Sequence, residues 1–318
     1  MKRVLAGILM ICTLFSVLSG CAASPGETTA PTETKHMLDG KKVIIIGNSH
    51  TYAGKTVVDV AKTVRDQKSR ENNRGMFYYL CQQKGAEVAV TNWCFSGHGL
   101  GAMFGGPCDK SYCDGEWHEN YLVDRYFDYV VVTPGVGNYA PETMTRDFDY
   151  ITKFFRDANP NVKFVLLGNA SSYGNNKDST PYPTITDHYQ VLKQQGWAIA
   201  DWGKIVNDII KGIVTVPDSA MEYNKNSFIN KDGYHPNLLS GYVTTMMLYC
   251  AMTGEDATTL PRDFFAEGSL WGTLMPQILE AQSDGGLSGT NAHLILTSDN
   301  ELLGIQQLID QYLERDRG

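Results

Sequence analysis

Short runs of apolar residues, separated by polar or glycine-containing turns, recur between residues 40 and 205. The sharpest is Val43-Ile44-Ile45-Ile46, which Gly47-Asn48 ends in a turn. Runs of this length without polar alternation indicate strands that are buried on both faces, as in a parallel sheet. The pattern predicts five such strands, at residues 43–46, 86–91, 127–133, 162–168 and 197–201.

Helical periodicity fills the intervals between these runs, at residues 53–84, 141–158, 186–195, 202–210 and 237–252. Buried strands that alternate with amphipathic helices predict an α/β protein. We expect a three-layer α/β/α sandwich with a five-stranded parallel sheet, flavodoxin-like in its arrangement. Residues 301–314 also carry apolar side chains at helical spacing, and we expect this terminal helix to dock on the domain or on a partner.

The first residues have the pattern of an export signal. Residues 1–20 place Lys2 and Arg3 before an apolar run that is shorter than the ~20 residues a membrane-spanning helix needs. The run ends in Leu18-Ser19-Gly20-Cys21, which resembles the bacterial lipobox and implies cleavage before Cys21 and its lipidation. The alternative is an ordinary signal peptide with a chance cysteine. We therefore expect an extracytoplasmic lipoprotein of the bacterial cell membrane, anchored only by lipid at its N-terminus.

Four segments follow from composition. The signal occupies residues 1–20, and residues 21–37, rich in Ser, Thr and Pro, form a flexible tether. Residues 38–275 are expected to form the α/β domain, and residues 276–318 a C-terminal extension that holds the terminal helix. A formal net charge of −8 argues against nucleic acid and against a polybasic membrane contact. The sequence assigns no oligomeric state.

The cysteines that remain after export are odd in number, so at least one thiol is unpaired. They are Cys81, Cys94, Cys108, Cys113 and Cys250. Cys108 and Cys113 lie in a Gly-rich stretch and are placed to close a small disulfide loop. The alternative is a zinc site that uses Cys94, Cys108, Cys113 and His98 or His118, but these spacings match no familiar ligand pattern. We expect no metal and no organic cofactor.

Candidate chemistry lies at two places far apart in the chain. Ser49 follows the first strand, at the sheet edge where α/β proteins bind ligands, so it is either a nucleophile or a helix cap. Asp232 and His235 are three residues apart just before a helix. At that spacing the carboxylate can accept from one ring nitrogen of His235 and leave the other nitrogen as a base.

The order Ser, Asp, His across an α/β domain resembles the SGNH (GDSL-type) hydrolase superfamily, in its Gly-Asn-Ser branch, from about residue 42 to 254. Gly47-Asn48-Ser49 matches the first block of that family, and Asp232-Gly233-Tyr234-His235 the last. The resemblance implies a serine esterase with Ser49 as nucleophile, His235 as base and Asp232 as its partner. It also implies an oxyanion hole formed by the backbone N–H groups of Ser49 and Gly97, with Gly99 the rival, and by the side chain of Asn138. The third block is imperfect, because Tyr139 follows Asn138 and the register is shifted; Asn169 after the fourth strand is the fallback.

Three further readings stay open. The esterase would act on small acyl esters, acetyl above all, carried by carbohydrate, with lipase or thioesterase activity as the runner-up. A catalytically inactive glycan-binding lipoprotein is the rival from another class. Residues 49–56 also come close to a phosphate-binding loop, but Ser49 replaces its first glycine.

Overall fold

The computed structural model describes residues 35–52, 57–58, 66–95, 99–100, 122–134, 141–169, 183–230, 235–262 and 298–317. All of these except Lys35 belong to one compact unit, His36–Gly318. The lipobox and the signal, including Cys21, lie outside the described residues.

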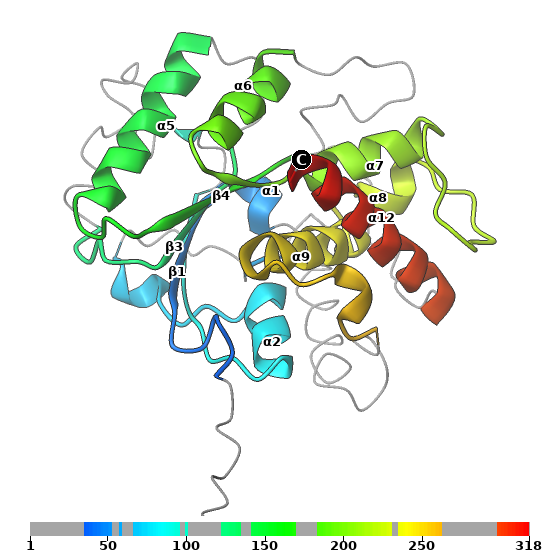
Figure 1. Cartoon of the computed structure of the whole chain (residues 1–318), viewed down its shortest axis with the longest axis horizontal. Coiled ribbons are helices and arrows are strands. Elements are labelled where there is room, and N and C mark those ends of the chain that lie inside the picture. The colour runs from blue at the N-terminus through cyan, green and yellow to red at the C-terminus, as the bar shows by residue number, and fades with distance from the viewer. Residues whose placement is uncertain are drawn as a thin grey trace, which may run out of the picture. The chain divides into compact units, whose positions relative to one another are not determined.

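A single parallel sheet forms the middle layer of this unit (Figure 1). Its strand order is β2-β1-β3-β4-β5, and adjacent strands pair in parallel throughout. The strands are β1 (Lys42–Gly47), β2 (Ala89–Cys94), β3 (Tyr129–Val132), β4 (Lys163–Leu167) and β5 (Ala198–Ala200). The predicted fold class, a sandwich around a five-stranded parallel sheet, is confirmed.

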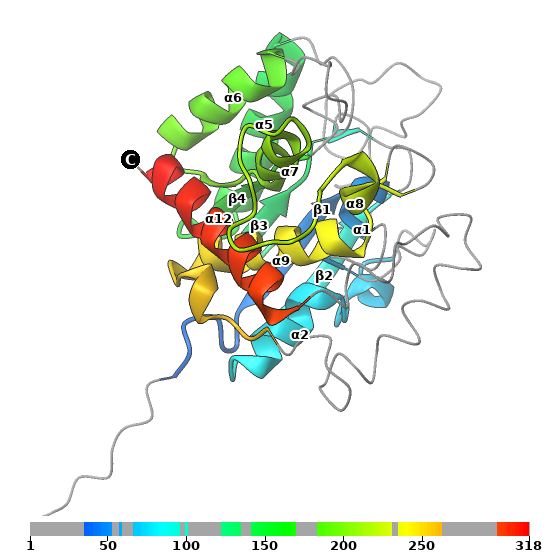
Figure 2. The same cartoon turned by 90° about the vertical axis from the view of Figure 1, so that its right-hand side faces the viewer.

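Alternate residues of the strands enter two separate cores, which is why the runs are apolar on both faces. Val43 and Ile45 of β1 face one core, whereas Ile44 and Ile46 face the other. The first core is covered by α2 (Met76–Gln83), α7 (Trp202–Ile210) and α9 (Leu238–Thr253), and the second by α5 (Pro141–Arg156) and α6 (Pro183–Gln194). Figures 1 and 2 show these helices on opposite sides of the sheet.

The helix α9 is apolar around its whole circumference, and nearly all of its side chains are buried. Such a helix needs neighbours on every side. The sheet, α2 and α7 supply part of this cover, and the terminal helix α12 (Asp299–Arg317) supplies the rest. In both views α12 lies beside α9 (Figures 1 and 2).

Two carboxylates fix α12 on the domain. Asp310 accepts hydrogen bonds from the backbone N–H groups of Ala257 and Thr258, in the 3-10 helix η4 (Ala257–Thr259), at 2.5 and 3.2 Å. Tyr312 donates its hydroxyl to Asp208 of α7 at 2.5 Å. The sequence left open whether this helix docks on the domain or on a partner. The structure shows it docked on the domain.

Two predicted boundaries are wrong. The segment 53–84 is not one helix. The short helix α1 (Ser49–Tyr52) precedes it, and its described residues form the 3-10 helix η2 (Lys68–Arg70) and then α2. Asn72 has φ of 55°, which breaks the helical path. The second strand begins at Ala89 and not at residue 86, because Lys42 of β1 pairs with Ala89.

The short helix α8 (Lys225–Phe228) was not anticipated. Within the described residues, no helix is long and apolar enough to span a membrane.

Candidate active site

The carboxyl ends of the strands gather polar side chains at one edge of the sheet. Gly47, the last residue of β1, pairs with Cys94, and Ile46 pairs with Val132, so the three strands end level with one another. The residues that follow the strand ends are Asn48, Phe95, Thr133, Gly168 and Asp201. This edge is where open α/β sheets bind their ligands.

A tight turn holds Ser49 at this edge. The side chain of Asn48 accepts a hydrogen bond from the backbone N–H of His50 at 3.0 Å, and the backbone carbonyl of Asn48 accepts from the N–H of Thr51 at 2.9 Å. A side chain at Gly47 would collide with the hydroxyl of Thr51, so only glycine permits this close turn. Ser49 therefore begins α1 directly after the strand and remains half-buried.

A second set of backbone contacts holds His235, and joins it to Asn230. The backbone N–H of Asn230 donates to the carbonyl of His235 at 2.8 Å, and its side-chain amide donates to the carbonyl of Pro236 at 3.0 Å. Ile229 and Pro236 form an antiparallel bridge. Residues 229–230 and 235–236 are thereby bonded to each other, which fixes the backbone of His235.

Asn237 ties the same backbone to two helices. Its side-chain oxygen caps α9 by accepting from the N–H groups of Leu239 and Ser240 at 3.0 and 3.2 Å. Its amide nitrogen donates to the carbonyl of Ser227 in α8 at 2.9 Å. Because His235 precedes Asn237 by two residues, this cap holds the backbone that follows the imidazole.

These two structures bring Ser49 and His235 together across 186 residues of sequence. The Ser49 Oγ atom lies 2.9 Å from the His235 Nε2 atom, within hydrogen-bonding distance. A serine hydroxyl and an imidazole nitrogen at this separation can pass a proton from one to the other, which is the first requirement of an activated nucleophile.

The other predicted site residues fall in two groups. Asp232, Gly97 and Asn138 lie outside the described residues, so their roles stay predictions. Asn169 is described: it is fully buried and follows β4 at the same sheet edge as Ser49. Its place is consistent with the fallback role in the oxyanion hole.

One positive charge is buried beside the end of β2. Arg70 of η2 donates to the carbonyl oxygens of Asn92 and Cys94, both at 3.1 Å, and its guanidinium lies 4.0 Å from the centre of the Phe95 ring. Burial lowers the pKa of Arg70 to about 10, so the group stays protonated at neutral pH. Arg70 thus fixes the strand end from which residues 96–98 continue, and the sequence analysis did not identify it.

His50 was also missed. Its ring stacks on the ring of His235, with 5.0 Å between ring centroids and 30° between ring planes. The side chain is only 4% exposed. A histidine next to the serine carries no sequence signal for this contact, because its partner is 185 residues further along the chain.

The described cysteines are free, buried thiols at positions 81, 94 and 250. Burial raises the pKa of the Cys94 thiol to about 12, and its Sγ atom lies 3.5 Å from the carbonyl oxygen of Ile45. The zinc alternative also needs Cys108, Cys113 and His98 or His118, which lie outside the described residues, so it is not tested. Cys108 and Cys113, and hence the suggested disulfide, lie outside the described residues, and among those described no three metal-binding side chains gather.

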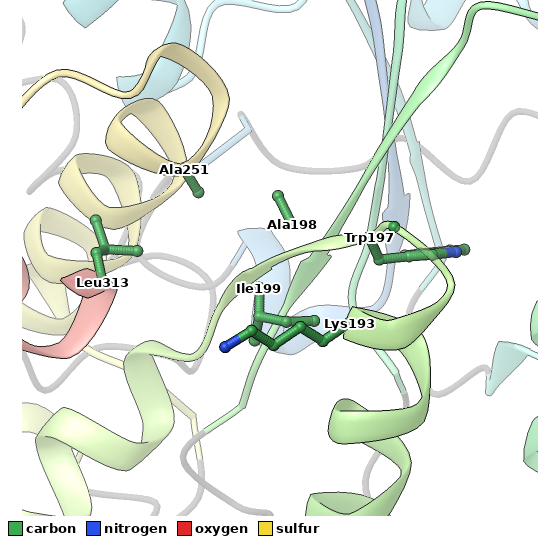
Figure 3. Close-up of a pocket in the computed structure, with 7 residues that line it drawn as sticks. Lys193, Trp197, Ala198, Ile199, Ala251 and Leu313 are labelled. Carbon is green, nitrogen blue, oxygen red and sulfur yellow. The ribbon is translucent and has the colours of Figure 1, made fainter. Parts of the chain in front are cut away.

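A cavity of about 330 Å³ opens far from this chemistry (Figure 3). Its lining includes Lys193, Trp197, Ile199, Ala251 and Leu313. Residues 197–199 enter β5 from its amino end, whereas Ser49 lies beyond the carboxyl end of β1. Because the strands are parallel, the cavity lies at the amino ends of the strands, whereas Ser49 lies at their carboxyl ends. The cavity is therefore not the candidate active site.

Comparison with known proteins gives similarities of fold. No family model and no curated protein matches the chain. Among solved structures, the acetylxylan esterase Axe2 from Geobacillus stearothermophilus is similar at 16% identity and a TM-score of 0.45, over 68% of this chain and 96% of that one. A DUF4886 family protein from Bacteroides uniformis is similar at 13% identity and a TM-score of 0.48, over 86% and 95%.

A candidate SGNH hydrolase from Slackia heliotrinireducens is similar at 15% identity and a TM-score of 0.39, over 68% of this chain and 99% of that one. With at most 16% of residues identical in these three, the similarity concerns the course of the backbone. A parallel sheet of order β2-β1-β3-β4-β5, with Ser49 after β1 and His235 before α9, is the arrangement that the SGNH-type motifs of the sequence imply.

Proposed function

We propose that the protein is a serine ester hydrolase of the SGNH type. The observation that carries this proposal is the 2.9 Å separation of Ser49 Oγ and His235 Nε2 at the carboxyl edge of the sheet. The motifs around both residues support the same assignment, since each stands where the resemblance to this superfamily requires it.

Acylation begins when Ser49 Oγ attacks the carbonyl carbon of the ester and His235 Nε2 takes the hydroxyl proton. The carbonyl π electrons move to oxygen, and a tetrahedral oxyanion forms. When this intermediate collapses, the bond to the leaving alcohol breaks and His235 returns the proton to the alcohol oxygen. The product is an acyl ester on Ser49.

Water completes the cycle by the same route. His235 takes a proton from water as the water oxygen attacks the acyl carbon, and the proton is then given to Ser49 Oγ as the acid leaves. We assign Asp232 to the Nδ1 side of His235, and the oxyanion to the N–H groups of Ser49 and Gly97 with Asn138 or Asn169. Removing one such donor typically costs about 2.7–4 kcal/mol of transition-state stabilisation.

For the substrate, we propose small acyl esters, acetyl above all, on carbohydrate. The support is the lipobox-like start and the formal net charge of −8, which favour an exported protein that does not bind nucleic acid, together with the resemblance to the SGNH superfamily. Esters of longer acyl chains are the alternative class.

The test is release of p-nitrophenol from its acetate and its octanoate by the purified protein, compared with Ser49→Ala and His235→Ala. We expect acetate turnover in the wild type and loss of at least 10³-fold in both variants, since covalent turnover needs both groups. A preference for octanoate would shift the substrate to lipids.

An organophosphonate provides a readout that does not depend on substrate choice. Mass spectrometry should find one adduct on Ser49 in the wild type and none in Ser49→Ala. If neither turnover nor adduct is found, the hydrolase proposal fails, and the scaffold is better tested as a glycan-binding protein by binding to glycan arrays.

We also propose lipid attachment at Cys21. The supporting pattern is Leu18-Ser19-Gly20-Cys21 after a short apolar run. Metabolic labelling with a palmitate analogue in a bacterial host should mark the wild type and not Cys21→Ala. Equal labelling of both would refute the anchor.

A further inference from the structure

His50 is the residue after the candidate nucleophile, yet it contacts the candidate base. Its ring lies 5.0 Å from the His235 ring, centroid to centroid, with 30° between the planes. Its own backbone is fixed, because its N–H donates to the Asn48 side chain at 3.0 Å. The stacked face is therefore held by the same turn that holds Ser49.

The contact matters because His235 Nε2 can take the serine proton only while the imidazole is turned toward Ser49 Oγ. The backbone carbonyl of His235 accepts a hydrogen bond from the N–H of Asn230. That contact fixes the main chain, whereas the rotation about the bond from Cβ to the ring depends on what the ring itself touches, including Asp232 as assigned above. A flat ring packed on the imidazole removes that rotation and keeps Nε2 in line with Ser49 Oγ at 2.9 Å.

Stacking also suits the charge that develops. When His235 takes the serine proton it becomes an imidazolium, and a planar ring stacked on its face stays in contact with it in both charge states. A side chain of equal bulk without a ring would fill the space but would provide no such face.

We propose that His50 is a positioning residue, which sets the plane of the His235 imidazole by ring stacking and so aligns Nε2 with the nucleophile. This role rests on the proposed hydrolase function. Nothing in the SGNH-type motifs of this sequence assigns it. His50 touches neither the substrate nor the reacting carbonyl in this scheme, and acts only through His235.

Three substitutions in the full chain separate the flat ring from simple bulk. His50→Phe keeps a ring, His50→Leu keeps volume without a ring, and His50→Ala removes both. We expect His50→Leu and His50→Ala to lower kcat on p-nitrophenyl acetate by about 10- to 100-fold with KM changed less than threefold, and His50→Phe to recover most of the loss.

His188→Leu is the matched control. His188 is also buried, at 6% exposure against 4% for His50, and its ring also lies against an aromatic ring, that of Phe148 at 5.5 Å. It stands on α6, whose apolar side chains enter the second core, whereas His235 precedes α9 of the first core. We expect kcat to stay within twofold of the wild type in this variant, so that loss of a buried histidine alone does not explain the effect.

Each possible pattern of activities in these variants either supports or overturns the proposal. Rescue by Phe but not by Leu supports stacking. Rescue by Leu and Phe alike would show that His50 only fills space, and failure of both would assign the effect to its ring nitrogens; either result overturns the proposal, as does wild-type kcat in His50→Ala.

A measurement of the ring itself keeps this result separate from the hydrolase proposal. In spectra of protein with ¹³C-labelled histidine, the His235 ring signals are assigned by their loss in His235→Ala. The face of His50 should shift these signals upfield, and the shift should persist in His50→Phe and disappear in His50→Leu. Unchanged His235 signals in the Leu variant would refute stacking. If the phosphonate adduct is absent while this shift is present, the function fails and the positioning contact stands.

Discussion

Asn237 joins three parts of the candidate site through one side chain: it caps α9, holds the end of α8 and stands two residues after His235. We expect Asn237→Ala to lower the free energy of unfolding by about 1–3 kcal/mol, because a cap is lost and the buried carbonyl of Ser227 loses its donor. Urea denaturation measures this. Asn237→Asp keeps the capping oxygen and should lose less; an unchanged urea midpoint in the Ala variant would contradict the role of the cap.

Asp147 of α5 is a buried carboxylate whose two oxygen atoms have different surroundings. Arg146 donates to its Oδ1 atom at 2.8 and 3.0 Å, and within the described part of the chain its Oδ2 atom has no hydrogen-bond partner. Burial raises the pKa of Asp147 above its usual value, although Arg146 opposes this. The folded protein therefore binds this proton more tightly than the unfolded chain does.

Because the folded protein binds the Asp147 proton more tightly, lowering the pH should stabilise the folded wild type relative to Asp147→Asn. We expect the variant to be the more stable at pH 7, and its advantage to shrink as the pH falls toward the usual pKa range of a carboxyl group. Chemical denaturation at several pH values measures the difference. Asp149→Asn on the same helix, at an exposed position, is the matched control, since the same change there removes no buried carboxylate.

At the scale of elements, the terminal helix makes an unusually close contact. Gly304 of α12 lies against the backbone of Pro217, and a Cβ atom at this position would collide with the Pro217 carbonyl oxygen. Gly→Ala within a helix normally stabilises by up to about 1 kcal/mol. Here we expect Gly304→Ala to destabilise by about 1–3 kcal/mol, because α12 must move off the domain. Thermal unfolding tests the sign, and the exposed Gln311→Ala on the same helix should be near neutral. Stabilisation by Gly304→Ala would mean that α12 is not docked this closely.

The sequence predicted these elements well where hydrophobic periodicity is strong, as in β1, α5, α7 and α9. It failed where tertiary pairing decides, because the start of β2 is set by the partner of Lys42 and not by local composition. The same division holds in the site. Ser49 and His235 stand in motifs and were predicted, whereas His50 and Arg70 act through contacts with residues that lie far along the chain or on a strand end. No local pattern encodes such contacts.

At the scale of the whole molecule, three buried thiols report whether the larger core opens as one unit. Cys81 lies on α2, Cys94 on β2 and Cys250 on α9, and all three belong to the core that includes α12. Burial raises the pKa of Cys81 and Cys94, so that native thiolate is scarce. Only opening of the core should make them reactive.

We therefore expect iodoacetamide to leave these three thiols unmodified in the native protein, and to label them together as urea reaches the unfolding midpoint. Peptide mass spectrometry resolves each site and separates them from Cys108 and Cys113. Coincident labelling curves would show that the sheet, α2 and α9 unfold in one transition. This is expected because these elements share one core, so that the loss of one of them exposes the buried side chains of the others. If Cys250 reacted well before Cys94, α9 would open while the sheet stays folded. His235 would then be carried away from Ser49 by a local opening, and activity would fall before global unfolding, at the urea concentration where Cys250 becomes reactive.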